Sequence, residues 1–301
     1  MKKYLVCIVG STAIGKTSKS IALAKSFETE IISADSRQFY KEMQIGTAVP
    51  SAEELAAVPH HFIQHISVDD KYAVGDFENQ ALQKLKQLFK KHDVVFMVGG
   101  SGLFIDAVTK GLDKFPEVKS GLRERLNNQL EEEGLASLQD QLKILDPVYA
   151  ETVDMKNPRR IIRALEISIS SGKPFSSFLN QPKPDRFFQS IKIGLEAPRE
   201  ILYQRINQRV DQMIEEGLLK EAKNLYAQRH KKALNTIGYK ELYAHIEGKY
   251  SLDFAIAEIK KNTRRFAKRQ MTWFRRDNTI KWFPYDRPSD EIAEYLHQKI
   301  E

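Results

Sequence analysis

The feature that most constrains the fold is a glycine-rich loop at residues 10–17, GSTAIGKT, which satisfies the pattern G-x-x-x-x-G-K-T. The apolar run at residues 4–9 predicts a buried strand before it, and residues 15–27 predict a helix after it. Strand, loop and helix together favour a phosphate site, in which successive backbone N–H groups and the helix start face one anion. Lys16 adds a positive charge, and the Thr17 hydroxyl can hold Mg²⁺. The residues predicted to bind the phosphate are Gly10, Ser11, Thr12, Ala13, Ile14, Gly15, Lys16 and Thr17.

A second short apolar run, residues 30–34, ends at Asp35. In open parallel sheets ligands lie outside the carboxyl ends of the strands, so we expect Asp35 at the same rim as the loop. A carboxylate there is placed to accept a proton from an incoming nucleophile. The alternative is an aspartate that only caps the backbone of Ser36 or Arg37, and the neighbouring phosphate loop favours the base.

The next helix and strand complete an alternating pattern that predicts an α/β fold. Residues 77–91 carry apolar side chains at helical spacing, and residues 93–98 form an apolar strand that ends in Gly99 and Gly100. A hydrolysing NTPase normally closes such a strand with an acid that helps to hold Mg²⁺. The glycines therefore favour group transfer over simple ATP hydrolysis.

Residues 114–189 differ in character, because they read as charged helices joined by Pro- and Ser-rich loops. Strand character returns at residues 190–195. We predict a P-loop NTPase-like parallel sheet flanked by helices, formed by residues 1–113 and 190–301, with residues 114–189 as an all-helical insertion domain.

One helix of the insertion is well delimited, with Asn157 as N-cap, Pro158 at the first helical position and Gly172 at the end. Its first turns carry Arg159, Arg160 and Arg163. Three positive charges at a helix start oppose the helix dipole unless an anion binds there. The cluster is therefore a mild indication of an anionic partner.

A long amphipathic helix is predicted over residues 199–228, where Arg205 and Arg209 stand one turn apart. They could reach a diphosphate, and an ordinary solvated or ion-paired face explains the spacing equally well. A second long helix is predicted over residues 254–276, and residues 279–283 are expected to form an edge strand.

The basic segment, residues 259–276, carries eight Lys or Arg residues and no acid. On a helix, Lys261, Arg264, Arg265, Lys268 and Arg275 fall on one side, opposite Ile259, Phe266, Trp273 and Phe274. Such a stripe is typical of a surface for a nucleic-acid backbone. A solvated helix face is the alternative.

Composition adds few constraints. The net charge of +7 permits an anionic partner without establishing one. The single Cys7 lies in an apolar run, which predicts a buried free thiol and suits a reducing cytoplasm. No apolar stretch approaches the length of a membrane span, and the seven histidines form no convincing metal site. We expect a soluble, cytoplasmic monomer.

Several motifs together resemble the bacterial tRNA dimethylallyltransferases, also called tRNA isopentenyltransferases. They occur in order over nearly the whole chain and are GSTAIGKT, ISADSRQFY, MQIGTAVP, VGGSGLF, NPRRIIRALE, TIGYKEL and TRRFAKRQMTWFRR.

The resemblance implies transfer of a dimethylallyl group from dimethylallyl diphosphate to N6 of adenosine 37 of tRNA, giving N6-dimethylallyladenosine. It implies Mg²⁺ as cofactor, held at Thr17, and a phosphate loop that binds the donor's diphosphate rather than ATP. The implied catalytic residues are Asp35 as general base, Lys16, Thr17 and Arg209. The implied tRNA-contacting residues are Asp35, Ser36, Arg37, Gln38, Ser101, Arg123, Arg159, Arg160, Ile161, Ile162 and Arg163.

The chain departs from the family's common pattern at four positions. Ser11 and Ile14 replace a common Pro and Ser in the loop, and Ile14 can alter the loop's outer contacts. Val49 stands where Lys is common, which removes a charge. Ser101 replaces a common Thr and keeps the hydroxyl.

Three other functions remain open at this stage. An adenylate isopentenyltransferase shares the loop and the base but takes free AMP, and does not need the basic segment. In a P-loop small-molecule kinase, Asp35 would deprotonate a hydroxyl. A nucleic-acid-binding protein whose loop only senses a nucleotide is the third alternative.

Overall fold

The computed structural model describes residues 2–300, which divide into two compact units. One unit combines residues 1–110 with 186–301, and the other comprises residues 111–185. The boundaries predicted from composition, 113 and 190, lie within a few residues of these. Each unit has its own apolar core.

The first unit is built on a six-stranded parallel sheet with the strand order β3-β2-β4-β1-β5-β6. The strands are β1 (Tyr4–Gly10), β2 (Ile31–Ser33), β3 (His60–His61), β4 (Val94–Gly99), β5 (Gln189–Glu196) and β6 (Lys281–Pro284). All residues of β1 and β4 are buried, as their continuous apolar runs predict. Cys7 is buried and free within β1, as expected.

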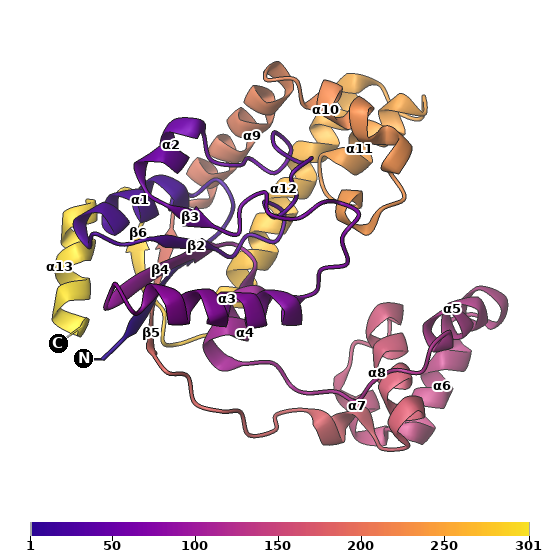
Figure 1. Ribbon diagram of the computed structural model, residues 1–301. Coiled ribbons are helices and arrows are strands. Elements are labelled where there is room, and N and C mark those ends of the chain that lie inside the picture. The colour runs from indigo at the N-terminus through magenta and orange to yellow at the C-terminus, as the bar shows by residue number, and fades with distance from the viewer. Residues whose placement is uncertain (1, 301) are drawn as a thin grey trace. The chain divides into compact units, whose positions relative to one another are not determined.

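Helices cover both faces of this sheet (Figure 1). The helices of this unit are α1 (Lys16–Ser26), α2 (Ala52–Ala57), α3 (Val74–Leu88), α4 (Gly102–Lys110), α9 (Arg199–Glu215), α10 (Leu218–Leu225), α11 (Tyr239–Ile246), α12 (Leu252–Phe274) and α13 (Ser289–Ile300), with 3-10 turns η2 (Tyr226–Gln228) and η3 (Lys232–Leu234). The side chains of α1 and α13 pack on one face and those of α3 and α4 on the other. The prediction of an α/β fold with a parallel sheet is confirmed.

The prediction of a single helix over residues 199–228 is wrong. The helix is interrupted between α9 and α10 at Gly217, which adopts a left-handed conformation. Figure 1 shows α10 and α11 gathered beside α9 and α12. These four helices share an apolar cluster that includes Val210, Leu218, Leu242 and Ile259. The break therefore lets the chain fold back and build a small helical layer on this unit.

The second unit is all helical, as expected for the insertion. Its helices are α5 (Leu122–Glu133), α6 (Leu135–Leu145), α7 (Pro147–Thr152) and α8 (Pro158–Ser171), followed by a 3-10 turn η1 (Phe175–Phe178). The predicted start of α8 is confirmed, because the Asn157 side chain accepts a hydrogen bond from the N–H of Arg160 and Pro158 is the first helical residue. Gly172 ends the helix in a left-handed conformation.

No helix among residues 2–300 has the length and apolar character required to cross a bilayer.

The end of β4 lies so close to the end of β2 that a side chain would not fit. A Cβ atom added to Gly99 would lie 2.5 Å from the carbonyl oxygen of Ala34. We therefore predict that Gly99→Ala lowers the free energy of unfolding by about 1–3 kcal/mol through overpacking. Urea unfolding measures this change. Gly75→Ala is the matched control, because a Cβ there meets no atom within 4 Å, and an equal loss in both variants would contradict the assignment.

Candidate active site

The phosphate loop connects β1 to α1, as the motif predicts. Helix α1 begins at Lys16 after Gly15, and no side chain caps it. Its first N–H groups therefore have neither an intrahelical acceptor nor a capping oxygen, which leaves them available to an anion. The Lys16 ammonium donates a hydrogen bond to the carbonyl of Ser11 at 2.7 Å, which holds the side chain across the loop.

Two side chains of the phosphate loop are buried. Ile14 is only 1% exposed and packs in the apolar core under the sheet, so the expectation that it alters the loop's outer contacts is wrong. Ser11 is fully buried as well. Both residues can contribute to phosphate binding through the main chain only.

Asp35 follows β2 directly and lies at the rim that the loop occupies. Its Oδ1 atom accepts a hydrogen bond from the backbone N–H of Arg37 at 3.1 Å. The capping interaction weighed as an alternative to a catalytic base is therefore present. It uses one carboxylate oxygen and fixes the side chain, while the second oxygen stays available to accept a proton.

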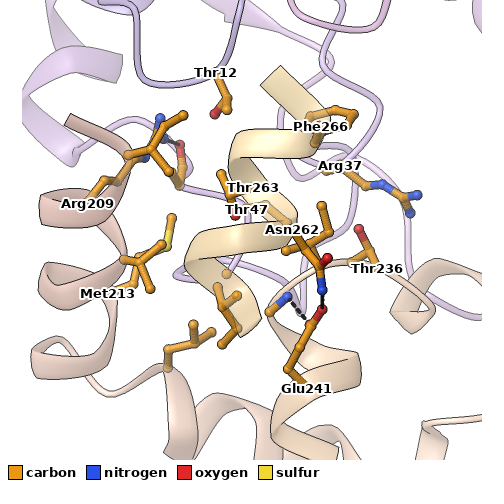
Figure 2. A pocket seen from close by; sticks show the side chains of 18 of the residues that line it. Thr12, Arg37, Thr47, Arg209, Met213, Thr236, Glu241, Asn262, Thr263 and Phe266 are labelled. Carbon is orange, nitrogen blue, oxygen red and sulfur yellow. Dashed lines mark hydrogen bonds between the residues drawn. The ribbon is translucent and has the colours of Figure 1, made fainter. Parts of the chain in front are cut away.

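Two adjoining cavities meet at Asp35. The larger, of about 800 Å³, is lined by the phosphate loop, including Lys16 and Thr17. The other, of about 490 Å³, has an apolar wall formed by side chains of α9 and α12. The residues that line both cavities are Thr12, Ala13, Asp35, Thr47, Ala48, Arg209 and Met213. Figure 2 shows the second cavity, with Arg209 and Met213 projecting from α9 and Phe266 from α12.

Lys16, Arg209 and Asp35 interact electrostatically where the two cavities meet. Burial lowers the pKa of Lys16 to about 8, with Arg209 acting in the same direction and Asp35 opposing it. Burial also lowers the pKa of the Arg209 guanidinium, and the carboxylates of Asp35, Glu54 and Glu216 oppose this shift. The effect of burial is still the largest at both cations, so an anionic ligand beside Lys16 and Arg209 would relieve the remaining cost of desolvation.

The structure joins two segments that were predicted separately as tRNA-contacting. The Ser101 hydroxyl, after β4, accepts a hydrogen bond from the N–H of Ser36 at 3.1 Å and lies 3.0 Å from the Ser36 hydroxyl. The Gln38 amide donates to the carbonyl of Ala48 at 2.8 Å. These contacts fix the turn that carries Asp35.

The segment at residues 44–48 is part of the site, although no function was predicted for these residues from the sequence. The Glu221 carboxylate accepts hydrogen bonds from three successive backbone N–H groups, those of residues 44–46, at 2.8–3.0 Å. It also accepts one from the Tyr239 hydroxyl at 2.6 Å. This clamp holds Thr47 and Ala48 in the walls of both cavities, and the motif TIGYKEL supplies the tyrosine.

Arg205 holds the phosphate loop in place. Its spacing on the helix predicted diphosphate contact and an ordinary solvated face equally well. Its Nε atom donates to the carbonyl of Ala13 at 2.9 Å, and its guanidinium lies over the Tyr285 ring. Arg209, one turn later, is the arginine that reaches both cavities.

The basic segment forms the C-terminal part of α12 as far as Phe274, and Arg275 and Arg276 follow the helix. The expectation of a stripe without balancing acids is wrong, because neighbouring acids pair with three of its cations: Lys260 with Asp211, Lys261 with Glu258, and Arg275 with Glu196. Arg264 bonds to Asn207. Within residues 2–300, the exposed cations of the segment that form no ion pair are Arg265, Lys268, Arg269 and Arg276. Trp273 is 38% exposed and donates to Asp106.

In the helical unit, the arginines predicted to contact tRNA have different surroundings. Arg159 and Arg160 are exposed. Arg163 lies over the Phe115 ring and 3.7 Å from Glu166. Arg123 forms two hydrogen bonds, of 2.7 and 2.6 Å, with the buried Glu166 carboxylate, which gives it a structural role of its own.

Ile161 and Ile162 were predicted as tRNA-contacting members of the same run. Their side chains are 0% and 5% exposed and pack in the core of the helical unit. The prediction that these two side chains contact tRNA is therefore wrong, and both belong to the core of the helical unit. An amphipathic helix presents buried and exposed positions in turn, so a run of consecutive residues cannot all face one partner.

Comparison with known proteins decides the family. The sequence profile described as IPP transferase matches residues 38–277, most of the chain. The chain belongs to the IPP transferase family. It is 62% identical to a tRNA dimethylallyltransferase of Christiangramia forsetii over 300 residues, covering 100% of this chain and 99% of the relative. A tRNA dimethylallyltransferase of Flavobacterium johnsoniae is 53% identical over 304 residues, covering 99% of this chain and 98% of the relative.

Two solved structures extend this finding. The tRNA isopentenylpyrophosphate transferase of Bacillus halodurans shares 39% identity with a TM-score of 0.74, covering 99% of this chain and 97% of the other. A eukaryotic dimethylallyltransferase acting on tRNA shares 27% identity with a TM-score of 0.83, covering 99% of this chain and 78% of the other. The IPP transferase fold therefore spans both units of the chain.

The lowered pKa of Lys16 predicts how anion binding depends on pH. The ammonium form binds the anion, and its fraction falls as pH rises through about 8, so the affinity for inorganic diphosphate should fall above that pH. Lys16→Met should bind at least tenfold more weakly, about 1.4 kcal/mol, and should lack this decline. Titration calorimetry measures both effects. The exposed Lys25 on α1 provides the control Lys25→Met, and a Lys16→Met curve parallel to wild type would contradict the assignment.

The Arg123–Glu166 pair predicts a stability effect in the helical unit. Arg123→Met leaves a buried carboxylate without its main partner and should lower the free energy of unfolding by about 2 kcal/mol. Urea unfolding measures the loss, and Arg125→Met, at an exposed position of the same helix, should show almost none. Unchanged stability together with weakened tRNA binding would assign Arg123 to RNA contact alone.

Proposed function

We propose that the protein transfers a dimethylallyl group from dimethylallyl diphosphate to N6 of adenosine 37 of tRNA and releases diphosphate. The observation that carries this proposal is the position of Asp35, which lies where a cavity lined by a phosphate loop meets a cavity with an apolar wall. Relatives that match the whole chain are named tRNA dimethylallyltransferases, which supports the same reaction.

The donor's diphosphate suits the larger cavity. Lys16, Arg209 and the free N–H groups at the start of α1 supply positive charge where the C–O bond breaks and its electron pair leaves with the diphosphate. The five-carbon group suits the apolar wall of the second cavity, which includes Ile206, Val210 and Phe266. These side chains exclude water, which would otherwise compete with the amine for the allylic carbon.

The acceptor amine then meets the donor beside Asp35. As the C–N bond forms, N6 loses one proton, and the free carboxylate oxygen of Asp35 accepts it. The hydrogen bond from Arg37 to the other oxygen keeps the carboxylate oriented during this transfer. Because the site is a recess at the rim of the sheet, the adenine has to leave its stack to reach it.

Mg²⁺ fits the site through the Thr17 hydroxyl, which belongs to the first turn of α1 and lines the larger cavity. Residues 2–300 contain no group of three or more His, Cys, Asp or Glu suited to a metal. Thr17 would thus share the ion with diphosphate oxygens and water, the arrangement that Mg²⁺ commonly adopts at phosphate sites. When bound, the ion supplies charge that stabilises the leaving diphosphate.

The tRNA backbone suits the unpaired cations described above, namely Arg265, Lys268, Arg269 and Arg276 on the first unit and Arg159 and Arg160 on the helical unit. Ser36, Gln38 and Ser101 belong to the segments that hold Asp35 in place, and they suit the nucleotide that carries the amine. We also propose that the working unit is a monomer. We further propose that the protein acts in the cytoplasm.

The experiment is prenyl transfer from labelled dimethylallyl diphosphate to unmodified tRNA, with AMP as the competing acceptor. Asp35→Asn should lower kcat by at least a hundredfold, because general bases typically contribute 10²–10⁴-fold, while tRNA affinity stays within about twofold. Asp185→Asn, at an exposed position, is the control.

Three results would contradict parts of this proposal. Label in AMP but not in tRNA would assign the adenylate reaction, and consumption of ATP without prenyl donor would assign a kinase. Full activity of Asp35→Asn would place the base elsewhere.

A further inference from the structure

Gln270 is a buried polar residue on α12, with only 6% of its surface exposed. Both ends of its amide are hydrogen bonded. The Oε1 atom accepts from the backbone N–H of Thr12 at 2.8 Å, and Nε2 donates to the carbonyl of Gly100 at 2.9 Å. Because a backbone N–H only donates and a carbonyl only accepts, these partners fix the orientation of the amide.

The two partners belong to different parts of the active site. Thr12 lies in the phosphate loop after β1, and Gly100 lies in the turn after β4. The next residue, Ser101, accepts the hydrogen bond from Ser36, which adjoins Asp35. One side chain therefore links the loop that suits the leaving group to the turn that supports the base.

The position of the Gln270 amide depends on glycine at position 100. A Cβ atom added at Gly100 would collide with the Gln270 amide nitrogen, so the absence of a side chain at that position lets the amide reach the main chain. Thr12, moreover, commits its N–H to Gln270. The anion is left with the amides farther along the loop, nearer Lys16 and the start of α1.

We propose that Gln270 is a positioning residue that sets the distance between the phosphate loop and the base Asp35. This role rests on the transfer reaction proposed above. Lys268 and Arg269 immediately precede Gln270 and are exposed. The same turn of α12 therefore carries two cations proposed to contact RNA and the residue proposed to position the loop. Gln270 thereby ties the geometry of the reacting groups to the helix that carries the RNA-facing cations.

Two substitutions separate the two hydrogen bonds. Gln270→Met has a similar length and removes both bonds, whereas Gln270→Glu keeps an acceptor for Thr12 but loses the donor to Gly100. With both substrates saturating, kcat should fall at least tenfold in Gln270→Met, because misplacing reacting groups slows the chemical step. The dissociation constant for tRNA should stay within twofold. Gln270→Glu should also lose kcat, which shows that the bond to Gly100 is required.

The control is Gln83→Met, an exposed glutamine on α3, which should retain wild-type kcat. Unchanged kcat with a raised KM for tRNA in Gln270→Met would make Gln270 an RNA contact and overturn the proposal. A lowered Tm with unchanged kcat per folded molecule would make it a packing residue and overturn it as well. Absence of transfer by the wild-type protein would refute the proposed reaction itself, which distinguishes the two failures.

A double-mutant cycle provides a second, independent test. Gly100→Ala displaces the Gln270 amide and should lower kcat at least fivefold in the wild-type background. In a Gln270→Ala background the collision is gone, and Gly100→Ala should change kcat less than twofold. If instead the two effects multiply, the residues act independently, and the proposed link does not exist.

Discussion

Two strand ends lie against their neighbours with no room for a side chain, and the active site depends on this closeness. A Cβ atom at Gly10 would lie 2.8 Å from the carbonyl of Leu195 on β5, and one at Gly99 would lie 2.5 Å from the carbonyl of Ala34. The phosphate loop begins at the first of these contacts, and Asp35 follows the second. Close contact of main-chain atoms at these two glycines therefore brings the phosphate loop and the Asp35 carboxylate to the same rim of the sheet.

The site that results is electrostatically incomplete without a ligand. Lys16 and Arg209 are desolvated enough for burial to lower the pKa of both, and Asp35 is the carboxylate that opposes the shift in each case. A diphosphate supplies the missing negative charge on the side of the loop, which leaves Asp35 free to accept a proton on the side of the apolar cavity. The same groups thus serve to bind the donor and to divide the site into a leaving-group side and an acceptor side.

Much of this architecture was predictable from sequence, because it follows from local patterns. Continuous apolar runs predicted the buried strands to within a residue or two, and the loop motif predicted the helix that begins at Lys16. The errors involve contacts between distant segments. The acids that pair with the basic segment lie mostly on other elements, the buried side of Ile161 and Ile162 depends on the fold of the helical unit, and Gly217 interrupts an otherwise helical pattern. The sequence contained one indication that Gln270 is buried. It is a polar residue that falls at helical spacing between Ala267 and Phe274, which are both buried.

The clamp formed by Glu221 has a consequence for how an anion can enter the site. Three consecutive N–H groups directed at one point, as in residues 44–46, form a concavity that attracts phosphate as readily as a phosphate loop does. Here a carboxylate of the protein itself already fills it. Of the two backbone concavities that border the larger cavity, only the one at the start of α1 remains open to a diphosphate. The donor's diphosphate therefore has one open backbone site beside this cavity, and binding there would fix the direction in which the attached allylic carbon points.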